Sequence, residues 1–424
     1  MRITRLEAQN IGPFEDLKID FEEKVIKDKA EIHILTGENG TGKSTVLMLL
    51  ASWVDDTNQT NIGSRLRLSK ETKEVMVTDF EKFLEGFKSS HKISFDSADE
   101  SKLYQLIKNG KKLNNLYRFY PKEFDLCPFF GYSGYRLTKG DGIVNIREIT
   151  SEPLENAVNF EKNIDSSLIL DWVANVVTKE LLAKSKGVES NDVNAVQKIE
   201  KALSDITNKK IEFDLEDTLK VSVKVNGVSL SFNTLPDGLK SIISWLSDLL
   251  MRLDRINWAD KSKSILEQNF ILFLDEIEVH LHPSWQRKIL PVVQDLFPNA
   301  QIFISTHSPF VVGSVDGARV YKFKLDENNN SVLEKTYLSE DGHSYQYYLR
   351  TGFDIDSDFG IENEKDLNRF MELKEKIIKG EDVDMGEFDE IMNRLENQTG
   401  ELSSIVGFEK RKLEKYLNKN LTTA

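Results

Sequence analysis

The chain has 424 residues, of which 39% are hydrophobic and 30% are charged, and its formal net charge is −14. This length predicts two or three structural units, or one large domain with insertions. The acidic balance argues against generic, sequence-blind DNA binding, because affinity for the phosphate backbone comes from Lys and Arg, so contact with nucleic acid would need a local cationic patch or a partner.

Apolar strands that alternate with helices predict an α/β domain with a largely parallel core sheet. Near the N-terminus two short strands flank a turn at Gly12-Pro13, and the apolar stretch 31–36 then runs into a glycine-rich loop and a buried helix. Later strands are expected within 127–136, within 211–232 with a hairpin at Asn226-Gly227, at 269–275 and at 300–306. Helices are expected within 155–207, at 238–252, at 283–297 and over most of the chain after residue 340.

The expected domain organisation is one α/β domain over residues 1–335 and a helical region, available for partner docking, over residues 336–424. Insertions are expected at about 55–122, where the composition turns polar, and at about 155–207. Cationic clusters in the first insertion could contact phosphates, although solvated loops are the simpler interpretation. These clusters are Arg65, Arg67, Lys70 and Lys73, and Lys108, Lys111 and Lys112.

Cysteine usage and hydropathy predict the compartment. Cys127 is the single cysteine, so no intrachain disulfide can form and a reducing compartment is expected. The N-terminus lacks the apolar core of a signal peptide. No apolar run approaches the ~20 residues of a membrane helix. These features predict a soluble cytoplasmic protein with no membrane span.

The stretch "GENGTGKS", from Gly37 to Ser44, fits the P-loop pattern G-x-x-x-x-G-K-[ST] and lies between an expected strand and an expected helix. Such glycines let backbone N–H groups turn onto phosphate oxygens, and the helix N-terminus favours the same anion. Lys43 would reach the β- and γ-phosphates, and Ser44 would coordinate Mg²⁺. The alternative, a chance glycine-rich turn, does not explain the flanking elements. The expected nucleotide-binding residues are Asn39, Gly40, Thr41, Gly42, Lys43, Ser44 and Thr45.

Two later strand ends supply the residues expected to complete an ATP and Mg²⁺ site. Asp275 ends the apolar strand "FILFLD", as a Walker B aspartate does, and would hold Mg²⁺. Glu276 follows it and could polarise an attacking water. The next strand ends in "STHSP", where His307 could hydrogen-bond the γ-phosphate or that water. The simpler alternatives are solvent-facing acids and a capped strand end.

Lys43, Asp275-Glu276 and His307, in this order, resemble the ABC-type ATPases of the SMC, RecF and OLD superfamily. The opening "ITRLEAQNIGPFEDLKIDFE" resembles their first strands, and "DEIEVHLHPSWQRKILPVV" with "ISTHSPFVV" is similar to the RecF/OLD-like members of bacterial defence systems. The resemblance covers roughly residues 1–320. It implies an ABC-type P-loop ATPase head with a helical insertion and a short helical C-terminal tail, in which two heads sandwich ATP.

The signature loop of these ATPases reads L-S-x-G, opens a helix and contacts the nucleotide on the other head. "LPDG", at 235–238, is similar to it in position. Pro236 stands where the family serine would meet the partner's γ-phosphate, whereas Gly238 and the helix N-terminus remain available. Ser241, one turn further on, could compensate only if the loop shifts. This departure implies slow hydrolysis, in a protein in which ATP binding matters more than turnover.

His280 and His282 have H-x-H spacing after two acids, which first suggests a metal site. Zinc, however, takes four protein ligands, or three and a water, and the nearby acids are already expected to serve Mg²⁺. In the family frame this segment is the D-loop, which crosses the dimer interface beside both nucleotides. The resemblance therefore implies that His282 hydrogen-bonds across the interface, with a charge that responds to its surroundings. No Q-loop glutamine is found, and Ser133 and Arg136 are weak substitutes.

OLD nucleases carry a metal-binding D-x-D pair after the ATPase. Asp354 and Asp356 form such a pair here, but no apolar strand precedes them, so a nuclease in the same chain is not expected. An ATPase head without its own effector resembles the PtuA family of Septu and retron anti-phage defence systems. That family implies a homodimer or higher oligomer that controls an HNH-type nuclease similar to PtuB. The tail at 363–418 is a candidate docking surface, unless it merely packs on its own ATPase core.

Two other functions stay open on the sequence. A RecF-like repair ATPase would bind DNA directly, but the acidic net charge of the chain argues against this function. In the leading interpretation, DNA is reached through the complex with the nuclease. An OLD-like ATPase-nuclease would act alone and would depend on the D-x-D pair.

Overall fold

The computed structural model describes residues 1–52, 91–95, 127–134, 149–160, 164, 166–186, 195–216, 220–258, 260–398 and 400–421, some of them by their backbone alone. The expected insertion at 55–122, with its cationic clusters, therefore lies outside the described residues except for strand β4 (His91–Phe95). Two compact units form, Met1–Phe353 and Asp354–Ala424.

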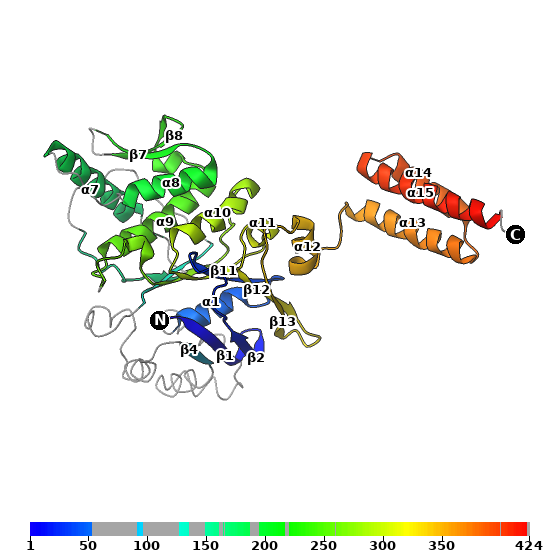
Figure 1. The fold of residues 1–424 in the computed structure, drawn as a ribbon, viewed down its shortest axis with the longest axis horizontal. Coiled ribbons are helices and arrows are strands. Elements are labelled where there is room, and N and C mark those ends of the chain that lie inside the picture. The colour runs from blue at the N-terminus through cyan, green and yellow to red at the C-terminus, as the bar shows by residue number, and fades with distance from the viewer. Residues whose placement is uncertain are drawn as a thin grey trace. The chain divides into compact units, whose positions relative to one another are not determined.

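A seven-stranded sheet forms the centre of the first unit (Figure 1). The order is β13-β12-β3-β11-β10-β5-β6, and every neighbouring pair is parallel except β12 with β13. The strands are β3 (Glu31–Gly37), β5 (Phe129–Tyr132), β6 (Val158–Asn159), β10 (Ile271–Leu274), β11 (Gln301–Ser305), β12 (Arg319–Leu325) and β13 (Ser331–Leu338). Strands β3, β5, β10 and β11 are buried along their whole length. The predicted α/β class with a largely parallel core sheet is confirmed.

Two small antiparallel sheets accompany the central one, in the orders β2-β1-β4 and β7-β8-β9. Their other strands are β1 (Ile3–Ile11), β2 (Phe14–Asp20), β7 (Ile211–Leu215), β8 (Val221–Val225) and β9 (Val228–Leu230). The predicted hairpin is confirmed, because Val225 pairs with Val228. Asn226 and Gly227 have φ values of 50° and 83°, the left-handed pair that a two-residue type I′ turn requires.

The helices of the first unit are α1 (Lys43–Ala51), α7 (Ser166–Ser185), α8 (Ala195–Thr207), α9 (Asp237–Arg255), α10 (Pro283–Leu296), α11 (Pro309–Val312) and α12 (Tyr345–Phe353). After its polar first turn, helix α1 is apolar on all sides, and most of its residues are buried. Helix α8, within the expected insertion at 155–207, packs on α9 and α10 (Figure 1) and joins the main core through Ile199, Leu203 and Ile206. Helix α8 is therefore part of the core of the unit and not of a peripheral insertion.

The second unit consists of α13 (Ile361–Lys379), α14 (Met385–Glu396) and α15 (Gly400–Leu421). Its own apolar core includes Phe370, Phe388, Leu395 and Val406. The units divide after Phe353 and not at the expected boundary of 335/336, because β13 pairs with β12 and α12 contacts β3. Among the described residues, no helix combines the length and apolarity that crossing a bilayer requires.

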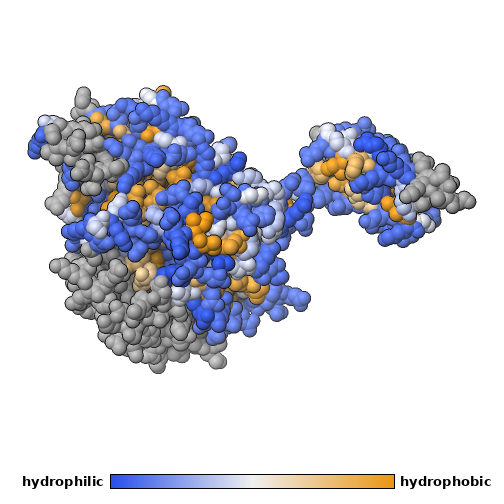
Figure 2. All heavy atoms as spheres, in the orientation of Figure 1, coloured by the Kyte–Doolittle hydropathy of each residue, from blue (hydrophilic) through white to orange (hydrophobic). Residues whose placement is uncertain are grey.

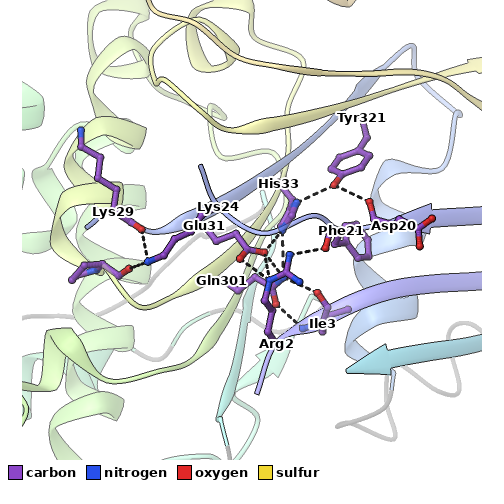
Figure 3. A network of polar contacts seen from close by, with 11 residues as sticks. Arg2, Ile3, Asp20, Phe21, Lys24, Lys29, Glu31, His33, Gln301 and Tyr321 are labelled. Carbon is purple, nitrogen blue, oxygen red and sulfur yellow. Dashed lines mark hydrogen bonds and ion pairs between the residues drawn. The ribbon is translucent and has the colours of Figure 1, made fainter. Parts of the chain in front are cut away.

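A buried polar network holds the beginnings of the central strands together (Figure 3). Arg2 Nε donates to both Glu31 carboxylate oxygens, at 2.9 and 2.7 Å, and Gln301 Nε2 donates to Oε1 at 2.7 Å. His33 Nε2 lies 2.6 Å from the same Oε1, and its Nδ1 lies 3.1 Å from the Tyr321 hydroxyl. Burial lowers the pKa of His33, so the imidazole is neutral at neutral pH. The network joins β1, β3, β11 and β12 at the edge of the sheet opposite the predicted P-loop.

Glu31 makes this network sensitive to pH. Burial favours its neutral form, but hydrogen bonds from His33 and Arg2 outweigh burial and lower its pKa to about 2. A carboxylate whose pKa is depressed on folding stabilises the native state above its unfolded pKa of ~4.3, and this stabilisation is lost as the pH falls toward 2. Glu31→Gln should therefore lower the free energy of unfolding by about 3 kcal/mol at pH 7, and by less at pH 3.

Urea denaturation at pH 7, 5 and 3, followed by tryptophan fluorescence, measures the difference. Glu7→Gln is a suitable control, because Glu7 is a half-exposed acid paired with Arg5 and Lys18 on the surface, where such pairs contribute at most about 1 kcal/mol. Equal losses in the two variants at pH 7 would contradict the role assigned to the network.

Candidate functional site

The loop from Gly37 to Gly42 joins β3 to α1 and depends on its glycines. Gly40 and Gly42 have φ values of 84° and 85°, in the left-handed region that favours glycine. A Cβ on Gly42 would lie 2.7 Å from the Phe14 ring, and a Cβ on Gly37 would lie 2.3 Å from the carbonyl oxygen of Phe323. Glycine is therefore required at Gly37 and Gly42 by close contacts and favoured at Gly40 by its backbone conformation. Because no side chain projects from these glycines, an anion can closely approach the backbone N–H groups of the loop and of the start of α1.

Lys43 lies at the first position of α1 and is 6% exposed. Its Nζ donates to the carbonyl oxygens of Gly37 and Glu38, at 2.9 and 2.8 Å. Burial lowers the pKa of Lys43 to about 8, although Asp275 and Glu276 act in the opposite direction. The ammonium group is therefore still predominantly charged at neutral pH and lies close to the two acids that the sequence assigned to the same site.

Asp275 brings three elements together at the end of β10. Its Oδ1 accepts a hydrogen bond from Ser44 Oγ at 2.9 Å and another from Ser305 Oγ. The N–H of Glu276 donates to Ser305 Oγ at 2.9 Å, and Glu276 has a left-handed φ of 48°. A Cβ on Gly134 would lie 2.9 Å from Glu276 Oε2, so the Glu276 side chain reaches the end of β5. Ser44, Asp275 and Glu276 thus meet, although the loop and β10 are far apart in the sequence.

The Ser44 hydroxyl and the Asp275 carboxylate are the hard oxygen ligands that Mg²⁺ prefers. The described residues contain no group of three or more His, Cys, Asp or Glu side chains that could hold a metal ion. One carboxylate beside a hydroxyl and a phosphate-binding loop fits Mg²⁺, which is usually held by one or two carboxylates together with substrate phosphates. The donor set therefore fits Mg²⁺ bound with a nucleotide.

Glu278, which the sequence did not single out, fixes the loop that carries His307. Its Oε2 accepts a hydrogen bond from Thr306 Oγ1 at 2.8 Å, and its Oε1 accepts one from the His307 N–H at 2.5 Å. Burial raises the pKa of Glu278. Burial and the neighbouring Lys43 lower the pKa of His307, so its imidazole is neutral at neutral pH. The sequence feature that could have identified Glu278 is that it is a third acid, two residues after Glu276.

The two histidines of the H-x-H pair lie in the turn that leads into α10, and both are exposed. His282 is the N-cap of α10, because its Nδ1 accepts a hydrogen bond from the Ser284 N–H at 3.2 Å. His280 has a left-handed φ of 65°. His282 thus has a structural role as a helix cap.

Gly238 lies in the first turn of α9 and packs directly on the His280 turn. A Cβ on Gly238 would lie 2.5 Å from the carbonyl oxygen of His280. Pro236 precedes the helix with an extended backbone, and Ser241 is buried. The two segments expected to contact a second head, the signature loop and the D-loop, are therefore neighbours in one chain.

Of the remaining candidates, Ser133 lies beside the site, next to Gly134, which approaches Glu276. Ser133 is buried at the end of β5, whereas Arg136 lies outside the part of the chain that the structure describes. Asp354 and Asp356 are exposed in the segment between α12 and α13.

The sequence is similar to retron and Septu proteins. It is 30% identical over 198 residues to the Retron Vc95 probable ATPase of Vibrio cholerae serotype O1 biovar El Tor, covering 45% of this chain and 34% of that protein. It is 28% identical over 240 residues to the Retron Ec83 probable ATPase of Escherichia coli, covering 47% and 42%. It is 24% identical over 376 residues to the Septu protein PtuA of Bacillus mycoides (strain KBAB4), covering 87% and 46%. The chain thus spans less than half the length of each of these relatives.

Among solved structures, an SMC head bound to the C-winged helix domain of ScpA matches with a TM-score of 0.41 at 11% identity, over 80% of this chain and 97% of that one.

Family models match most of the first unit. A model of an AAA domain matches residues 1–54. A second model matches residues 32–313, about two-thirds of the chain, from before the glycine-rich loop to beyond His307. All the residues brought together around Asp275 lie within this range. The chain therefore belongs to the family described as AAA domain, putative AbiEii toxin, Type IV TA system.

Proposed function

We propose that this chain is an ATP-binding regulatory ATPase of a bacterial anti-phage defence system, which dimerises or forms a higher oligomer around ATP and controls an HNH-type nuclease. The observation that carries the proposal is the hydrogen bond between Ser44 and Asp275, which joins the glycine-rich loop to the acids after β10. The similarity to proteins named retron ATPases and Septu PtuA supports the link to defence systems.

Each residue has a distinct role in ATP binding and hydrolysis. The N–H groups of the loop from Asn39 to Thr45 would bind phosphate oxygens, and Lys43 would contact the β- and γ-phosphates. Ser44 and Asp275 would hold Mg²⁺, which neutralises charge on the phosphates when bound. Glu276 would orient the attacking water. Neutral His307, whose backbone is held by Glu278, can accept a hydrogen bond from that water or donate one to the γ-phosphate.

A second head would complete the site. Gly238 and the N-terminus of α9 would bind the γ-phosphate on the other subunit, and His282 would lie at the same interface. Pro236 has no hydroxyl to offer that phosphate, so turnover is slow and the ATP-bound oligomer is long-lived. In this proposal the unit Met1–Phe353 supplies the ATPase core, and the helical unit Asp354–Ala424, which forms most of the region expected at 336–424, docks the nuclease, through which DNA is reached.

The ATPase proposal is tested by changing the water-orienting acid. Glu276→Gln should lower the rate of ATP hydrolysis by about 100-fold or more, because it removes the general base, while ATP binding persists and an ATP-bound oligomer accumulates. Phosphate release and light-scattering mass with Mg²⁺·ATP measure the two effects. Lys43→Ala, the control, should lose ATP binding and oligomer together. A Glu276→Gln variant that hydrolyses ATP normally would refute the assigned role.

The role of His282 at the subunit interface can be separated from its role as a helix cap. His282→Ala should abolish ATP-dependent oligomerisation or hydrolysis while ATP still binds to the monomer. His282→Asn keeps a capping side chain at the N-terminus of α10, so it should preserve stability but still lose oligomerisation. If the His282→Asn variant formed normal oligomers, the role of His282 would be limited to capping α10. Loss of ATP binding in either variant would contradict the D-loop assignment.

Control of a nuclease predicts a stable complex. The full chain, tagged and purified from its native host, should retain an HNH-type nuclease, and the amount retained should change when ATP is added. Mass spectrometry of the eluate identifies the partner, and Lys43→Ala controls for the ATP dependence. Recovery of the chain alone under both conditions would contradict the proposed regulation.

A further inference from the structure

One side of α15 carries exposed aromatic and cationic side chains that lie outside the apolar core of the second unit, although the Tyr416 hydroxyl donates to the Ile378 carbonyl oxygen at 3.4 Å. The set consists of Phe408, Arg411, Lys412, Lys415 and Tyr416. Each lies three or four residues from another member, which places all five on one side of a helix. All five are exposed, Phe408 by 53% and Tyr416 by 42%. We call these five residues the α15 outer face.

The opposite side of α15 supplies the packing. Leu402, Val406 and Leu413 are buried in the core of the unit together with Phe370 and Leu395. The helix thus has its apolar contacts already, and two exposed rings remain on the outer face. Figure 2 shows apolar and strongly polar surface side by side on the visible face of this unit.

The local charge of α15 is opposite to that of the chain. From Phe408 to Leu421 the sequence has five cations and two acids, whereas the whole chain has a net charge of −14. Glu409 is turned inward, where it accepts from Lys374 at 2.6 Å and from Lys412 at 2.7 Å. Glu414 is exposed at the edge of the face, and Glu401 lies about two turns before Phe408.

The cations and rings of the outer face are interleaved. Lys412 Nζ lies 4.3 Å from the centre of the Phe408 ring. Phe408 and Tyr416 are eight residues apart, which corresponds to ~12 Å along a helix. Successive rings with cations between them can stack on bases while the cations bind phosphates, the combination by which proteins hold single strands.

We propose that the α15 outer face binds single-stranded nucleic acid. Arg411, Lys412 and Lys415 contact the phosphates, and Phe408 and Tyr416 stack on bases. A membrane-surface helix would insert its apolar side, but that side of α15 is buried in the bundle. An acidic protein would pair with the cations and leave the rings unused. The proposal goes beyond the proposed function, in which DNA is reached only through the nuclease, and does not depend on ATP hydrolysis.

The test uses the full chain and a fluorescent 20-nucleotide oligothymidine, with binding followed by anisotropy. The triple variant Arg411→Gln, Lys412→Gln and Lys415→Gln should bind at least ten-fold more weakly than wild type. Its slope of log affinity against log salt should fall in magnitude by about 2, because three phosphate contacts are lost. Phe408→Ala and Tyr416→Ala should each weaken binding about five-fold or more.

The matched control removes the same charge from the same unit. Lys365→Gln, Lys376→Gln and Lys379→Gln change three cations of α13, two of which are paired with acids on that helix, and should leave affinity within two-fold of wild type. Thermal melting checks that both triple variants fold. Absence of wild-type binding, equal weakening in the two triple variants, or indifference to loss of the rings would each overturn the proposal. So would binding to anionic vesicles without binding to the oligonucleotide.

Discussion

The site depends on the Asp275 carboxylate, which accepts hydrogen bonds from Ser44 at the start of α1 and from Ser305 at the end of β11. Asp275 is partly buried, which costs a carboxylate free energy unless donors compensate, and both donors come from other elements. The sheet order places β10 next to β11 and β11 next to β3, so the three strand ends converge at one edge. The parallel sheet therefore determines which residues meet.

The same strands are fixed at their opposite ends. Glu31 begins β3 and Gln301 begins β11, and a hydrogen bond of 2.7 Å joins them within the network around His33. A strand tied at its beginning and bonded to its neighbours cannot shift register without moving its side chains to the other face. The Asp275 contact with Ser305 thus constrains the far end of β11, and the hydrogen bond from Lys43 to the Gly37 carbonyl oxygen constrains the far end of β3. The apolar core is packed between these ends and the polar network.

The α/β class, the glycine-rich loop and the Asn226-Gly227 hairpin could be predicted from the sequence, because each depends on neighbouring residues. Gly42, for instance, belongs to the P-loop sequence pattern, and the structure gives it the left-handed φ that such a glycine allows. The contacts of Glu278 could not be predicted, since its partners Thr306 and His307 lie 28 and 29 residues away on another element. The packing of Gly238 on His280 depends in the same way on tertiary structure, and so does the place where the two units divide.

The segment between Asp275 and α10 connects all the distant parts of the site. Its beginning faces the glycine-rich loop through Asp275, its middle holds the His307 backbone through Glu278, and its end contacts the first turn of α9 through the His280 carbonyl oxygen. Glu276 and His280 both have left-handed backbones, a conformation that costs an ordinary residue free energy and persists only where surrounding contacts enforce it. A displacement of the α9 N-terminus would press on the same turn whose other end positions the acids.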